Sequence, residues 1–61
     1  MYSYLPQTVF PTKNGGHTYV GFIVDEDDKT VRPDTTNFEL LSDEDRKLIA
    51  DEFASVGLRL S

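Results

Sequence analysis

The chain of 61 residues contains no cysteine and no tryptophan, and it has only one histidine. The absence of cysteine excludes disulfide bonds and thiolate-bound zinc, and a single histidine excludes a histidine-rich metal site. A chain of this length buries only about 60% of the surface that its unfolded form exposes, so its stability margin is narrow. We therefore expect a tight local fold or self-association to stabilise it, with no metal and no cofactor.

Long apolar runs are also missing. The longest covers residues 19–24 and is interrupted by Gly21, whereas a membrane-spanning helix needs about 20 apolar residues. The first six residues have neither the basic start nor the apolar stretch of a signal peptide. Because the lack of cysteine also suits a reducing compartment, we predict a cytoplasmic protein that does not enter a membrane.

Acidic residues are missing from the first 24 positions, and all eleven lie between Asp25 and Glu52. The net charge is −5, and residues 25–52, with eleven acids against four bases, carry −7. This charge repels nucleic acids and anionic membranes, whose phosphates need lysine and arginine. It attracts basic proteins, including those that bind nucleic acids. The competing interpretation is that the acids only keep a small protein in solution.

Asn14-Gly15 is the strongest local signal, because this pair is the preferred centre of a two-residue type I′ hairpin turn. It predicts strands over about 7–13 and 17–24. Pro11 cannot donate to a ladder, so the first strand is expected at the edge of the sheet. The turn pairs Phe10 with Tyr19 and Val9 with Val20.

The acidic run at residues 25–28, after the second predicted strand, predicts a solvated turn. Residues 30–32 are a candidate third strand. A helix is predicted over about 43–56, because Ser42 is a good N-cap and Gly57 a natural residue after the C-cap. Its apolar stripe consists of Leu48, Ile49, Phe53 and Val56. Residues 58–60 fit either a short strand or a tucked tail.

Together these elements predict one small α+β domain over residues 1–61. It consists of an antiparallel β-hairpin or three-stranded sheet packed against one C-terminal helix, in the order ββ(β)α. The predicted register makes both sheet faces apolar. One face carries Val9, Val20, Phe22 and Val24, and the other carries Phe10, Tyr19, Ile23 and, if the strand extends that far, Tyr4.

A single helix, about 10 Å across, covers only one face of a small sheet. The second face therefore needs another cover. The candidates are residues 38–41, the tail at 58–60, a second copy of the chain, and a different protein.

No catalytic or metal-binding motif is present. The EF-hand pattern fails because Thr30 and Thr36 occupy the positions of its glycine and its last glutamate. His17 has no acid or cysteine near it in the sequence, and Asp45 and Glu52 share a helix face that is expected to be exposed. We therefore predict that the protein is not an enzyme.

The sequence favours a small acidic protein-binding module that modulates or inhibits a larger protein by occluding its surface, a character typical of phage and mobile-element products. The predicted partner-binding residues are Tyr4, Phe10, Tyr19, Ile23, Asp25, Glu26, Asp27 and Asp28. Two alternatives stay open. In one, the acids imitate the phosphates of nucleic acid and inhibit a basic DNA- or RNA-binding protein. In the other, the chain is a homo-oligomeric structural subunit, such as a homodimer.

Overall fold

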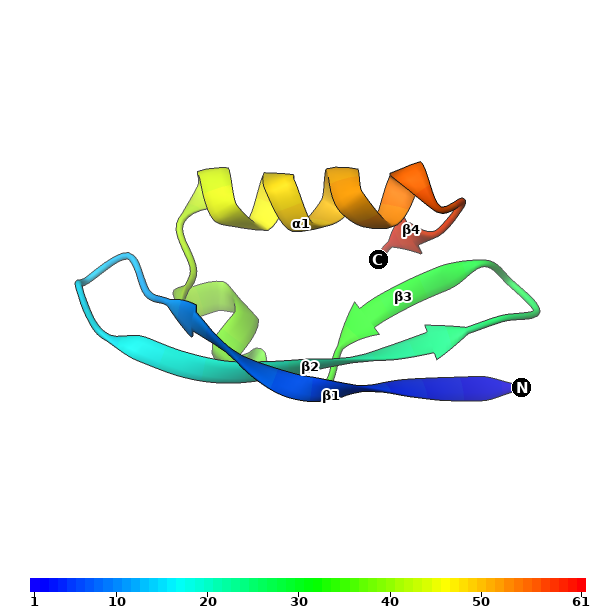
Figure 1. The fold of residues 1–61 in the computed structure, drawn as a ribbon, viewed down its shortest axis with the longest axis horizontal. Coiled ribbons are helices and arrows are strands. Elements are labelled where there is room, and N and C mark those ends of the chain that lie inside the picture. Colours follow the sequence, from blue (N-terminus) through cyan, green and yellow to red (C-terminus); the bar gives the residue numbers. More distant parts are fainter.

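The computed structural model describes residues 1–61 and shows an α+β fold, in which the helices lie along one mixed four-stranded sheet (Figure 1). Three strands are antiparallel neighbours and the last strand pairs parallel to the third. The elements are β1 (Tyr2–Pro11), β2 (His17–Asp25), β3 (Thr30–Pro33), the 3-10 helix η1 (Thr36–Leu40), α1 (Asp43–Ser55) and β4 (Arg59–Leu60). The predicted fold class, a small sheet packed against one C-terminal helix, is confirmed.

Strand β1 is an edge strand, as Pro11 indicated, but it begins near residue 2 rather than residue 7. The ladder runs past Pro6 because the register between β1 and β2 shifts between Leu5 and Thr8. Such an irregularity takes up residues that a regular ladder does not accommodate, proline among them. Proline at position 6 therefore bends the strand without ending it.

The hairpin turn differs from the prediction by one residue. The N–H of Thr12 donates to the carbonyl of Gly16 at 2.9 Å, and the N–H of Gly15 donates to the carbonyl of Thr12 at 3.1 Å. Gly15 has a φ of 93°, whereas Asn14 does not have the positive φ that a type I′ turn requires. The loop is therefore the three-residue kind, in which a left-handed glycine closes the turn.

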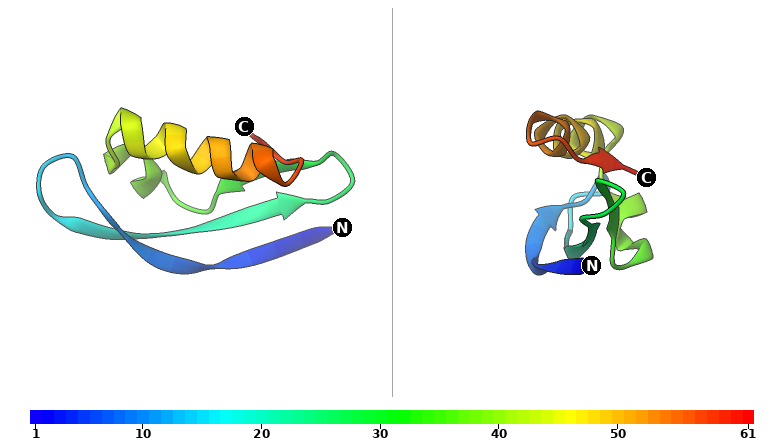
Figure 2. Two further views of the ribbon diagram at one scale, coloured as in Figure 1. Left: turned by 45° about the horizontal axis from the view of Figure 1, so that its top comes forward. Right: turned by 90° about the vertical axis from the view of Figure 1, so that its right-hand side faces the viewer.

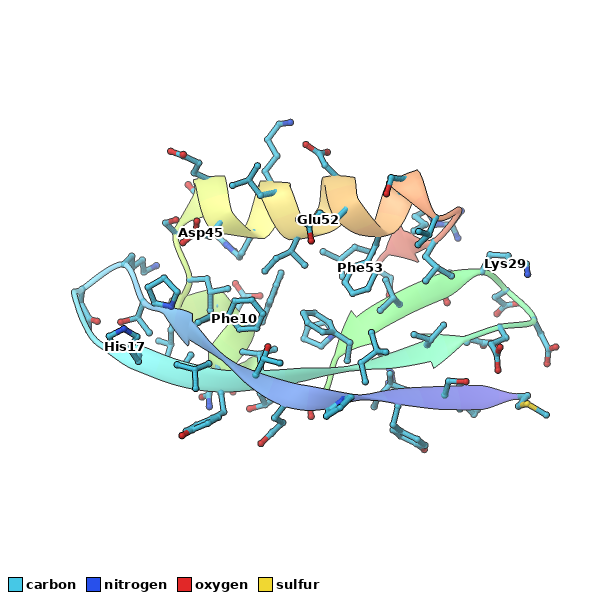
Figure 3. All side chains as sticks on the ribbon, in the orientation of Figure 1. Phe10, His17, Lys29, Asp45, Glu52 and Phe53 are labelled. Atoms are coloured by element: carbon cyan, nitrogen blue, oxygen red, sulfur yellow. The ribbon has the colours of Figure 1, made fainter.

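The predicted pairs of Phe10 with Tyr19 and of Val9 with Val20 are consequently wrong. Phe10 stands opposite Thr18, and Val9 stands opposite Tyr19. A slip of one residue exchanges the two faces of a strand. Phe10 is half-buried and packs against the core under α1 (Figure 3). Val9 is exposed on the opposite face.

The core lies between the sheet and the segments that follow it. It contains Val20, Phe22, Val24, Val31, Phe38 and Leu41. The ring of Phe22 is edge-to-face with Phe38, at a centroid distance of 6.0 Å, and with Phe53, at 5.0 Å. Leu58 and Leu60 pack against the same cluster. Residues 38–41 and 58–60 therefore both cover the face that α1 covers, and neither reaches the second face.

Both ends of α1 form as the sequence predicted. The Ser42 hydroxyl accepts the N–H of Asp45 at 3.1 Å. At the other end the N–H of Gly57, which has a φ of 83°, donates to Ala54, and the N–H of Leu58 donates to Phe53, both at 3.0 Å. This pair of bonds is the Schellman motif, which satisfies the last carbonyls of the helix and turns the chain into β4.

Helix α1 lies shallowly on the sheet, and none of its residues is buried. Only Ile49 and Phe53 of the predicted stripe pack against the core, whereas Leu48 is 55% exposed and Val56 is 70% exposed. The predicted stripe is therefore only partly buried, and Leu48 and Val56 lie outside the core. The molecule is elongated, with extents of 36 × 18 × 14 Å (Figure 2). Neither helix combines the length and the apolar character that crossing a bilayer requires.

Candidate functional site

The sheet face that points away from α1, called the outer face below, is not covered by any helix (Figure 1). Side chains alternate between faces along each strand, and residues opposite each other share a face. The pairs of Tyr4 with Ile23 and of Val9 with Tyr19 therefore lie on the outer face. The exposed fractions are 72% for Tyr4, 59% for Tyr19 and 52% for Val9, and Ile23 is half-buried.

A polar bridge divides this outer face. The N–H of Gly21 donates to Oδ1 of Asp34 at 3.0 Å, and the N–H of Asp34 donates to the carbonyl of Gly21 at 2.9 Å. The side-chain amide of Gln7 donates to Oδ2 of Asp34 at 3.3 Å. Because Asp34 and Gln7 close over Gly21, the apolar pair Val9–Tyr19 is separated from the apolar pair Tyr4–Ile23.

The acidic turn, residues 25–28, lies at the end of the sheet that carries Tyr2 and Tyr4, since Tyr2 stands opposite Asp25. The Asp25 carboxylate accepts the N–H groups of Asp27 and Asp28, at 3.1 and 3.3 Å, and so holds the turn together. The structure therefore places the acidic turn beside the aromatic end of the outer face.

Two of these carboxylates already have partners within the chain. Glu26 accepts the Ser3 hydroxyl at 2.8 Å, and Asp27 pairs with the amino group of Met1 at 2.6 Å. Both groups of the Met1–Asp27 pair are about four-fifths exposed, with side-chain exposures of 83% and 80%. Water screens such a pair, so the carboxylate of Asp27 stays accessible to a charged partner. Glu26 is exposed as well.

Among the predicted partner-binding residues, the structure thus brings Tyr4 and Ile23 together with the turn at 25–28. It places Tyr19 on the same face but beyond the Asp34 bridge. It places Phe10 on the opposite face, so Phe10 does not belong to the predicted surface.

Two of the acidic clusters lie far apart. The turn at 25–28 and the first turn of α1, which contains Asp43, Glu44 and Asp45, lie at opposite ends of the molecule (Figure 1). Arg46 pairs with Asp43 and with Glu39, the latter at 3.1 Å. The charges that a nucleic-acid mimic would present are therefore dispersed along the long axis.

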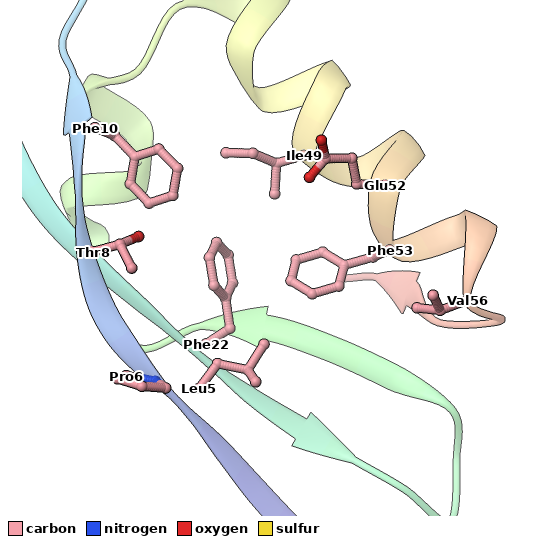
Figure 4. Close-up of a pocket in the computed structure, with 9 residues that line it drawn as sticks. All are labelled: Leu5, Pro6, Thr8, Phe10, Phe22, Ile49, Glu52, Phe53 and Val56. Atoms are coloured by element: carbon pink, nitrogen blue, oxygen red, sulfur yellow. The ribbon is translucent and has the colours of Figure 1, made fainter.

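An apolar groove, which the sequence interpretation missed, opens between β1 and α1 (Figure 4). It has a volume of about 430 Å³. Leu5, Pro6, Thr8, Phe10, Phe22, Ile49, Glu52, Phe53 and Val56 line it. The signal that could have revealed it is the width of the helical stripe, because Leu48 and Val56 add apolar surface that one small sheet does not bury.

The outer face and the groove can both bury apolar side chains of another molecule. No three His, Cys, Asp or Glu side chains gather where they could hold a metal ion. No protein family, curated protein or solved structure matches the chain.

Proposed function

We propose that this chain is a small acidic protein-binding module that modulates or inhibits a larger protein by occluding part of its surface. One observation carries the proposal: Tyr4, 72% exposed, lies with Ile23 on an uncovered sheet face, directly beside the acidic turn. Uncovered apolar patches with polar rims mark interaction sites on soluble proteins. Tyrosine is enriched in binding hot spots, because its ring buries a large area while its hydroxyl keeps a polar partner.

The two parts of this surface have different roles. The apolar pair Tyr4–Ile23 supplies the contact that is buried on binding. The acids at 25–28 orient a basic partner and accelerate the encounter, since charges at an interface rim act mainly on the association rate.

The size of the chain supports binding through a whole face. A standard interface buries about 800 Å² of each partner, and the chain exposes 4278 Å² in total. Such an interface would occupy about a fifth of the surface, which is an area that only a face of the sheet or of the helix layer offers. Once bound through this face, the rest of the chain would block access of other molecules to the partner's surface.

The test is capture of the partner by immobilised protein from nuclease-treated lysate of its source cells, quantified by mass spectrometry. The wild type and a Lys47→Ala variant, changed on the exposed side of α1, should capture the same protein in stoichiometric amount. Tyr4→Ala should lose most of it, and raised salt should slow its association. Capture that Tyr4→Ala leaves unchanged, or no stoichiometric partner at all, would contradict the proposal.

A further inference from the structure

The groove lies between α1 and β1, on the face of the sheet under the helix. Only β1 and β2 contribute sheet residues to its lining. Strand β3 pairs with β2 over Phe22–Asp25 and does not extend beside Thr8 and Phe10. Helix α1 packs against β4, at one side of the sheet, and the groove opens on the β1 side (Figures 1 and 4).

The groove has the shape and lining of a site for an apolar ligand. Leu5 and Phe10 form its wall on β1, and Phe22 forms its floor (Figure 4). Ile49 on α1 and Val56 at the C-cap of that helix form the opposite wall. A second hollow of about 200 Å³ continues past Phe10 and Ile49.

Along the helix, the combined groove extends from Asp45 to Val56. At 1.5 Å per residue this is about 16 Å, or three helical turns. An occupant of the same length would therefore contact α1 along most of its course.

The charges on the groove favour a basic occupant. Glu52 lines both hollows and Asp45 lines the second, while no lysine or arginine lines either one. Helix α1 has five acids, among them Asp45 and Glu52, against two bases, Arg46 and Lys47. The α1 helix of a second copy would bring like charges together, so the groove does not suit self-association through this helix.

The free edge of β1 is a poor site for an added strand of another molecule, so a helix is the more suitable occupant of the groove. Pro6 and Pro11 both lie in β1 and have no N–H to donate. The register also shifts between Leu5 and Thr8. An incoming strand would find its ladder interrupted, whereas a helix satisfies its own backbone and needs only the apolar walls.

We propose that this groove binds an amphipathic α-helix of a partner protein, about three turns long, whose apolar stripe is flanked by lysine or arginine. This mode of recognition places apolar anchors at helical spacing into a preformed groove. The groove opens on the opposite side of the sheet from the outer face, so it stands independently of the function proposed above.

The probe is a fluorescein-labelled synthetic peptide of about 15 residues, long enough to form a helix, with leucines on one helical face and lysines beside them. Two matched peptides serve as controls. One has the same composition with the leucines scattered around the helix, and the other has glutamate in place of lysine. By fluorescence anisotropy with the full chain, the striped lysine peptide should bind at least about tenfold more tightly than either control. Equal affinity for the striped and scattered peptides would overturn the proposal.

Substitutions in the chain test whether the peptide binds in the groove. Val56→Asp should weaken binding about tenfold, since it sets an unpaired charge in an apolar contact. Ala54→Asp adds the same charge at an exposed position outside the groove and should have no effect. Tyr4→Ala should also leave the peptide affinity unchanged, which separates this site from the outer face. Binding that Val56→Asp does not weaken would contradict the groove as the site.

Charge reversal tests the basic character of the ligand. Glu52→Lys should weaken the lysine peptide about three- to tenfold and strengthen the glutamate peptide. Glu44→Lys makes the same change in net charge outside the groove and should shift neither affinity. If sedimentation shows a dimer that Val56→Asp converts to a monomer, a second copy occupies the groove and the proposal is wrong.

Discussion

The ring of Phe53 on α1 meets the ring of Phe22 on β2 edge to face, with centroids 5.0 Å apart and planes inclined by 69°. Only one other residue of α1, Ile49, packs against the core. The attachment of α1 to the sheet therefore depends on the side chains of Ile49 and Phe53.

Phe53→Ala should lower the free energy of unfolding by about 2–3 kcal/mol, somewhat below the cost of a fully buried phenylalanine because Phe53 is half-buried. Val56→Ala, at the C-cap of the same helix and 70% exposed, should change it by less than about 0.5 kcal/mol. Urea denaturation followed by circular dichroism measures both. Equal effects would mean that Phe53 does not anchor the helix.

The register of the hairpin can be tested with two adjacent substitutions. Val9→Lys should change stability by less than about 0.5 kcal/mol, because Val9 is 52% exposed on the outer face. Phe10→Lys should cost about 2 kcal/mol or more, because it removes an aromatic ring from the side of the core and places a charge there. The register first predicted from Asn14-Gly15 requires the opposite order, so thermal unfolding of the two variants decides between the registers.

Gly21→Ala should destabilise the protein by about 1–3 kcal/mol through overpacking. An added Cβ would lie 2.5 Å from Oδ2 of Asp34 and 2.9 Å from the carbonyl oxygen of Leu5, which is backbone and cannot move aside. Gly16→Ala is the matched control, since its nearest contact would be 3.3 Å, to the Thr12 hydroxyl. A smaller loss for Gly21→Ala than for Gly16→Ala in chemical denaturation would refute the close approach.

Ser42→Ala should cost about 1 kcal/mol, because the N–H of Asp45 loses its acceptor at the start of α1. Ser55→Ala removes a hydroxyl that bonds only to the Glu52 carbonyl of its own helix, so it should be neutral within about 0.5 kcal/mol. Helix content and thermal midpoint report both effects. A neutral Ser42→Ala would show that the cap contributes nothing measurable.

The outer face should tolerate change without loss of the fold. Tyr4→Ser and Tyr19→Ser should each alter the free energy of unfolding by less than about 0.5–1 kcal/mol, because both rings are more than half exposed. Guanidinium denaturation checks this. A large loss of stability in either variant would mean that the ring packs within the chain, and would remove it from the proposed contact surface.

The features that the sequence alone determined are local ones. Ser42 and Gly57 set the ends of α1, because a cap is a hydrogen bond between residues three to five positions apart. Pro11 marked the edge strand, since a missing N–H is a property of one residue. The hairpin signal and the helix signals together predicted the α+β class, and the acidic run at 25–28 predicted the turn between two strands.

Only the tertiary structure decided the faces and the groove. The Asn-Gly signal allows two loops that differ by one residue, and a slip of one residue moves Phe10 from one face to the other. Leu48 and Val56 fit the helical stripe, yet their exposure depends on where α1 lies across the sheet. These outcomes are set by contacts between residues far apart in the chain, whose packing energies no local pattern encodes.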